Sequence, residues 1–122
     1  MEQDYQTLTP ELEEELKFKI KSWTEKAKIG MKAEFPGLYR RLQKSGELKE
    51  HLTKIGQDAA MIEAKNLDWL TENVTPEKTY GHPNPSLQER ATQNLLNEDT
   101  AKEMTYEYLN AIMRELDLAT RG

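Results

Sequence analysis

The chain has 122 residues, a length that suits a single domain, with 36% apolar and 32% charged residues. This apolar fraction is low for a globular protein, so the core is modest and an elongated helical assembly or an oligomer is favoured. The absence of cysteine excludes disulfides, thiolate catalysis and thiolate metal sites.

Targeting signals are also missing. No apolar run approaches the roughly 20 residues that cross a bilayer. The first 16 residues are acidic and lack the basic-then-apolar layout of a signal peptide. We therefore expect a cytoplasmic protein with no membrane partner.

Charge is distributed unevenly along the chain. Residues 1–16 carry six acids and no Lys or Arg, residues 17–54 carry a net charge of +7, and residues 55–122 carry −6. A basic block between two acidic blocks is suited to an acidic partner.

A long helix is predicted to follow a disordered start. Residues 1–8 show no periodicity, and Thr9-Pro10 is a helix-start signal that opens a single helical domain over residues 9–122. Apolar residues then recur every three or four positions, at Leu12, Leu16, Ile20, Trp23, Ala27 and Met31. This stripe predicts a helix of about 24 residues.

Two further helices are predicted in the middle of the chain. Pro36 ends the first helix because the residue before a proline is disfavoured in the α region. A short helix then runs to Ser45-Gly46, and a third runs from Leu48 to about Leu70, with Ser45 as its cap.

A proline-rich loop separates these helices from a long final helix. Pro76, Gly81 and Pro83 predict a loop without a helix over residues 73–84. Asn84-Pro85 repeats the cap-plus-proline start, and a 3.6-residue stripe then predicts one helix from about Pro85 to Ala119, with a kink or break near Asn97. Its apolar positions are Leu87, Ala91, Leu95, Ala101, Leu109, Ile112 and Leu116. The fold class is therefore all-α: an elongated bundle of about four helices, the first and last of them long.

Catalytic chemistry finds little support in the sequence. Glu50 and His51 form the one polar pair that packing does not demand, and Glu47 lies one turn before His51. A metal site needs at least a third ligand, and none has the right spacing. We expect no catalytic, cofactor-binding or metal-binding residues, and hence no enzyme.

The basic block is the stronger functional candidate. Its possible nucleic-acid contacts are Lys17, Lys21, Lys28, Lys32, Arg40, Arg41 and Lys44. Four of these lysines fall within about 60° of each other beside the apolar stripe of the first helix. The alternative is structural, because lysines that flank an apolar seam commonly lie over it and keep their ammonium groups in water.

The long stripes themselves imply partners. Such helices close on one another within one chain, or pair across a homodimer or with another protein. Trp23, Trp69 and Tyr108 are the natural anchors, and core packing is the default prediction for each.

The segment from Pro36 to Ile55 reads PGLYRRLQKSGELKEHLTKI. It resembles the TnpV family of small proteins encoded in bacterial transposons and integrative elements. The resemblance implies a mobile-element setting and an accessory role, with no catalytic residues to transfer. We therefore expect a non-enzymatic helical interaction or accessory protein of mobile-element origin, with a small DNA-binding accessory factor that uses residues 17–54 as the alternative.

Overall fold

The computed structural model describes residues 9–121, and every regular element in this range is an α-helix. The elements are α1 (Pro10–Glu34), α2 (Pro36–Ser45), α3 (Leu48–Asn73), α4 (Pro76–Tyr80) and α5 (Leu87–Thr120). The prediction of an all-α fold with long first and last helices is confirmed. The disorder expected for residues 1–8 concerns positions outside the described range.

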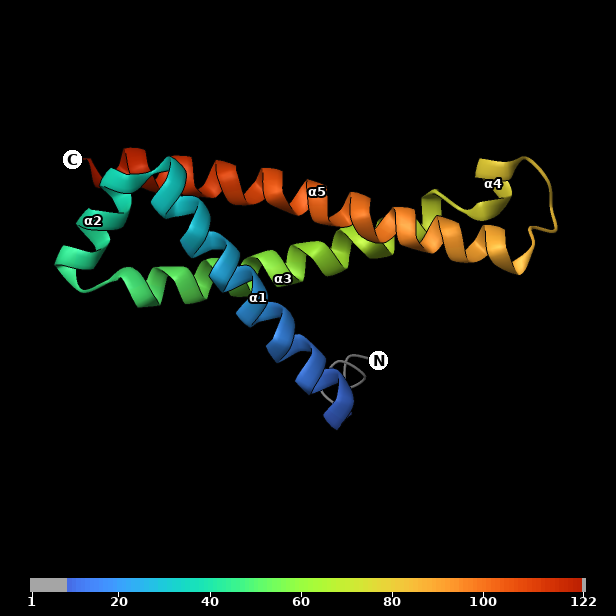
Figure 1. Cartoon of the computed structure of the whole chain (residues 1–122), viewed down its shortest axis with the longest axis horizontal. Coiled ribbons are helices and arrows are strands. Elements are labelled where there is room, and N and C mark those ends of the chain that lie inside the picture. Colours follow the sequence, from blue (N-terminus) through green and yellow to red (C-terminus); the bar gives the residue numbers. More distant parts are fainter. Residues whose placement is uncertain (1–8, 122) are drawn as a thin grey trace.

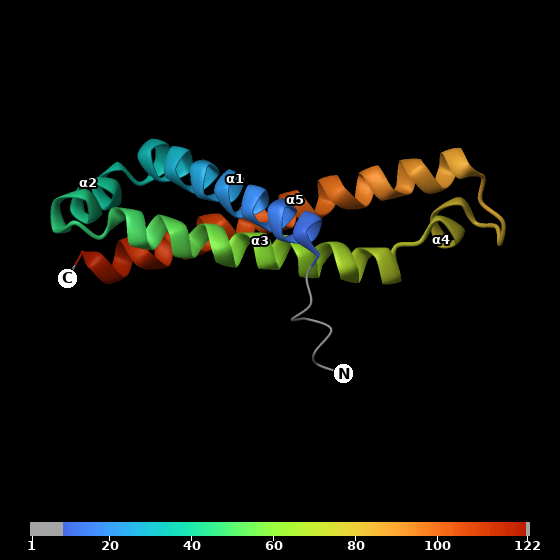
Figure 2. The same cartoon turned by 90° about the horizontal axis from the view of Figure 1, so that it is seen from below.

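The molecule is elongated around the antiparallel pair of α3 and α5, which cross each other along its long axis (Figure 1). Helix α1 crosses over α3 from one side, and its N-terminal half extends away from the pair (Figures 1 and 2). Helix α2 closes one end of the pair, and α4 with its loop lies at the other end. Only part of the pair is therefore covered by a third helix.

The predicted breaks between the first three helices fall where expected. Helix α1 ends at Glu34, and Pro36 is the first residue of α2. Gly46 ends α2 with φ 82°, a left-handed conformation that favours glycine. Ser45 does not cap α3 as predicted; its hydroxyl donates to the Leu42 carbonyl, and α3 begins after Glu47 without a side-chain cap.

The prediction that residues 73–84 hold no helix is wrong. Helix α4 fits between the breakers because each stands at a permitted position. The Thr75 side chain caps the helix, Pro76 occupies its first turn, and Gly81 ends it with φ 74°. A dense group of breakers thus bounds a single helical turn instead of abolishing it.

Helix α5 is continuous, without the break predicted near Asn97. It begins after Ser86, which forms a reciprocal capping box with Glu89, two residues later than the predicted Asn84 cap. The predicted stripe is wrong in its first half, because Leu87 is 87% exposed and Leu95 is 63% exposed. The positions that are buried recur every four residues, at Gln93, Asn97, Ala101, Thr105, Leu109, Met113 and Asp117.

The four-residue spacing has a geometric cause. Four residues advance about 400° around an α-helix, so the buried line turns by about 40° at each step. A line of this kind follows the ridge used by helices that cross at a marked angle. Helix α5 therefore lies beside α4 at its start, meets the end of α3 at Asn97, and adds α1 and α2 as neighbours towards its own end (Figure 1).

The core lies where α1, α2, α3 and α5 meet. Its buried apolar residues are Trp23, Ala27, Met31, Leu38, Leu42, Leu52, Ile55, Ala59, Ala60, Leu109 and Met113. Gly56 sets the spacing of α1 and α3: a Cβ atom there would lie 2.0 Å from Thr24 Oγ1 and 3.0 Å from the Ile20 carbonyl oxygen. The backbones of these two helices approach closely because this residue has no side chain.

Candidate interaction surfaces

One face of the α3–α5 pair is not covered by any helix within residues 9–121. We call it the open face and define it by six apolar or aromatic residues: Met61, Ile62, Trp69, Leu96, Met104 and Tyr108. Trp69 is 57% exposed, Met61 56% and Leu96 50%. Met104 is exposed as well, whereas Ile62 and Tyr108 are half-buried. Large apolar side chains gathered on one face in this way mark interaction surfaces in many proteins.

Helical geometry places these residues opposite α1. Gly56 and Glu63 face α1, and Trp69 lies six residues after Glu63, about 120° around the helix. On α5, Tyr106 packs edge-on against Trp23 of α1, with ring centres 5.0 Å apart. Met104 and Tyr108 each stand two residues from Tyr106, about 160° away, so they point to the other side of the pair.

Tyr108 provides independent evidence for this placement. Its pKa is raised, first by burial and then by the negative charges of Asp58 on α3 and Glu115 on α5. Asp58 stands four residues before Ile62, on the same side of α3. Tyr108 of α5 therefore lies close to Asp58 of α3, on the side of the pair that carries Ile62.

A second apolar surface lies between the N-terminal half of α1 and α3. It is a groove lined by Leu12 and Leu16 of α1 and by Ala60, Ala64 and Leu67 of α3. Leu12 and Leu16 belong to the predicted stripe of the first helix, yet both are exposed because α1 diverges from the bundle before them. The stripe is thus buried only from Trp23 onward.

The aromatic anchors fall into different settings. Trp23 is buried as predicted, and its Nε1 donates to Glu63 Oε1 over 2.9 Å. The core prediction for Trp69 is wrong, because Trp69 lies on the open face, away from α1. Glu63 was not singled out by the sequence, since a buried carboxylate on an otherwise apolar helix face has no distinctive spacing. It also accepts from Lys19 Nζ at 3.5 Å.

The basic candidates are not gathered on one surface. Lys17, Lys21, Arg40 and Lys44 are exposed on α1 and α2, and the ammonium group of Lys32 lies 5.3 Å from the ring centre of Tyr39. Lys28 joins Lys49, Gln43 and Tyr39 around a hollow between α1, α2 and α3. This hollow brings together two lysines of the basic segment, Lys28 and Lys49.

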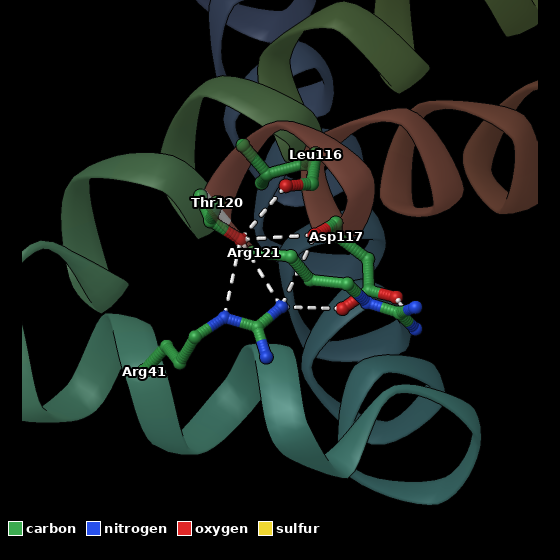
Figure 3. Close-up of polar contacts among 5 residues, drawn as sticks. All are labelled: Arg41, Leu116, Asp117, Thr120 and Arg121. Atoms are coloured by element: carbon green, nitrogen blue, oxygen red, sulfur yellow. Dashed lines mark hydrogen bonds and ion pairs between the residues drawn. The ribbon is translucent and has the colours of Figure 1, made fainter.

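Arg41 makes its contacts within the fold. Its guanidinium donates from α2 to the Asp117 carboxylate over 2.5 Å and to the Asp117 carbonyl and Thr120 Oγ1 near the end of α5 (Figure 3). Arg121 also donates to Asp117, over 2.7 Å. The hydrogen bond from Arg41 is the main cause of the lowered pKa of Asp117. Arg41 therefore fastens α2 to the C-terminal turn of α5.

The polar pair of the sequence borders a shallow hollow between α3 and α5. Glu50 and His51 line it together with Lys54, Asp58 and Glu115. Within residues 9–121, no group of three or more His, Cys, Asp or Glu side chains is placed to hold a metal ion. Nor does that part of the chain contain a helix long and apolar enough to cross a membrane.

Comparison with known proteins adds no relative: no family model, curated protein or solved structure matches the chain. The resemblance of residues 36–55 to TnpV stays a prediction. The surfaces described above are therefore the basis for any functional proposal.

Proposed function

We propose that the protein is a non-enzymatic helical accessory protein that acts by associating with another protein. The observation that carries this proposal is the open face, where Trp69 and Leu96 are at least half exposed. Aromatic and large apolar residues dominate the energetics of protein interfaces. Leaving such residues in water brings the monomer no benefit, so a partner surface supplies the physical reason for their presence.

The mobile-element origin is the second part of the proposal and is supported by the TnpV-like segment. That segment is built into the fold: Leu38, Leu42 and Leu52 are buried, whereas Glu50 stays exposed at the surface. The motif therefore supports a shared architecture, and the accessory role follows from it. The partner expected on this basis is a recombination or mobilisation protein encoded by the same element.

The test is a binding titration between the purified chain and the recombination proteins encoded beside its gene. Two variants probe the two apolar surfaces separately: Trp69→Glu on the open face and Leu16→Glu in the α1–α3 groove. We expect association that one of these changes weakens, while circular dichroism stays unchanged because both residues are exposed. A chain that neither self-associates nor binds these proteins contradicts the proposal.

DNA binding is a second candidate, and the hollow that holds Lys28 and Lys49 is the observation in its favour. We expect affinity for duplex DNA at low salt that falls steeply as salt rises, because cations released from the phosphates drive such binding. Lys28→Glu and Lys49→Glu should each weaken it strongly, and Lys78→Glu, on α4, is the control with the same change in net charge. Equal loss in the control variant would assign the effect to net charge alone.

A further inference from the structure

We infer that the open face is covered by a second copy of this chain, in a two-fold symmetric dimer. This inference deepens the proposed function and rests on it, since it names the chain itself as the protein with which the open face associates. Three features of the structure support it: the accessible area, the shape of the α3–α5 pair, and opposite charges on its two helices.

The chain exposes more surface than a compact monomer of its mass. Its accessible area is 8747 Å² at 14.2 kDa, whereas a folded monomer of that mass exposes about 6800 Å². The nine residues outside the described range contribute at most about 1500 Å² even as a fully extended chain. Subtracting both from the accessible area leaves an excess of at least about 450 Å², more than half of the roughly 800 Å² that each partner buries in a standard interface.

The shape of the pair is self-complementary. Because α3 and α5 cross, α3 protrudes from the open face at one end of the pair and α5 protrudes at the other end (Figures 1 and 2). We place the two-fold axis midway between α3 and α5, parallel to the long direction of the pair. Rotation about this axis lays α3 of one subunit along α5 of the other, and these two helices run antiparallel. The prominent end of each helix then meets the recessed end of its counterpart, and four helices enclose the open-face residues of both subunits.

The charges agree with this orientation. Lys65 is exposed on α3, in the same row of the open face as Met61 and Trp69 and four residues from each, and Glu107 is exposed on α5, next to Tyr108 in sequence. The hydrogen bond from Asn66 Nδ2 to Thr105 Oγ1 shows that the two stand at the same level of the pair. The symmetry operation brings Lys65 against Glu107 of the partner subunit, and this contact occurs twice. Neither residue forms an ion pair within the described part of the chain.

The oligomeric state is tested by light scattering and sedimentation equilibrium on the full chain. We expect a dimer, and Trp69→Glu should raise its dissociation constant by about 100-fold or more, because the substitution places two charges in one apolar interface. Leu95→Glu is the matched control. Leu95 is 63% exposed and precedes the open-face residue Leu96 in α5, but it points away from the open face. It should leave the dissociation constant within about threefold.

The orientation is tested by disulfide trapping, which the chain permits without background because it has no cysteine. Mild oxidation of the double variant Lys65→Cys with Glu107→Cys should give a covalent dimer. Each single variant should stay monomeric under denaturing conditions, because the two copies of either residue lie on opposite edges of the interface. Dimers from a single variant, or none from the double variant, overturn the proposed axis.

Failure of this inference is distinguishable from failure of the proposed function. A chain that is monomeric at about 100 μM, or a dimer unaffected by Trp69→Glu, overturns the inference. If such a chain still binds a neighbour-encoded recombination protein through the open face, the proposed function stands with a different occupant. If it binds none, both are overturned.

Discussion

Replacing Gly56 with alanine tests the close approach of α1 and α3, on which the placement of every surface described above depends. The new Cβ atom would lie 2.0 Å from Thr24 Oγ1 and 3.0 Å from both Thr24 Cβ and the Ile20 carbonyl oxygen. Rotation of the Thr24 side chain relieves only the first contact. It also gives up the 2.7 Å hydrogen bond from that hydroxyl to the Ile20 carbonyl.

The magnitude follows from opposing effects. Alanine stabilises a helix interior by about 1 kcal/mol relative to glycine. Against this, overpacking costs about 1–3 kcal/mol, and the lost hydrogen bond costs about 1 kcal/mol. We expect Gly56→Ala to lower the free energy of unfolding by about 1–3 kcal/mol, or roughly 4–12 °C in the midpoint of thermal unfolding.

Gly30 provides the matched control, because it also lies inside a long helix. A Cβ atom there would lie 3.4 Å from Met113 Cε, the mobile end of a flexible side chain. Gly30→Ala should therefore leave the stability unchanged or raise it by up to about 1 kcal/mol. Urea unfolding followed by circular dichroism at one fixed protein concentration gives both values, since dimerisation would make stability concentration-dependent. Equal stabilities of the two variants would refute the close approach of α1 and α3.

Three further predictions concern polar contacts. Arg41→Ala should lower the midpoint of thermal unfolding at pH 7. Because the folded-state pKa of Asp117 is depressed, the stability that this ion pair contributes is present above the ordinary pKa of the carboxyl group and is lost as the pH falls through the folded-state pKa. The midpoints of parent and variant, plotted against pH, should therefore converge at acidic pH. Glu63→Leu should destabilise the protein by about 1–3 kcal/mol and shift the fluorescence of Trp23, whose N–H would lose its acceptor, whereas Glu63→Gln should cost less; equal losses in urea unfolding would contradict this role. Asn97→Ala should cost about 1–2 kcal/mol in the same assay, because the amide donates to two carbonyls at the end of α3, and an unchanged midpoint would speak against that contact.

The sequence determined the elements that depend on neighbouring residues. Pro36 and Gly46 act through their own backbone preferences, so the ends of α1 and α2 were predictable. The long apolar stripes repeat at the helical period, which also involves only neighbouring residues, so they predicted the all-α fold. The prediction from sequence was wrong where helix-starting and helix-breaking residues stand close together. At Thr75-Pro76 these residues mark the ends of a helical turn instead of preventing one.

Only the tertiary structure decided which helix faces are buried, because burial depends on how far each neighbouring helix extends. Helix α1 leaves the bundle before Leu16, and the crossing of α3 and α5 turns the buried line of α5 away from Leu95 and towards Asn97 and Thr105. The sequence also did not indicate that Arg41 of α2 would bind Asp117 at the end of α5. Trp69 was predicted to lie in the core, but no helix within residues 9–121 covers it. An elongated helix pair has two faces, and the described part of this chain covers one of them; this depends on packing, which the helical period does not encode.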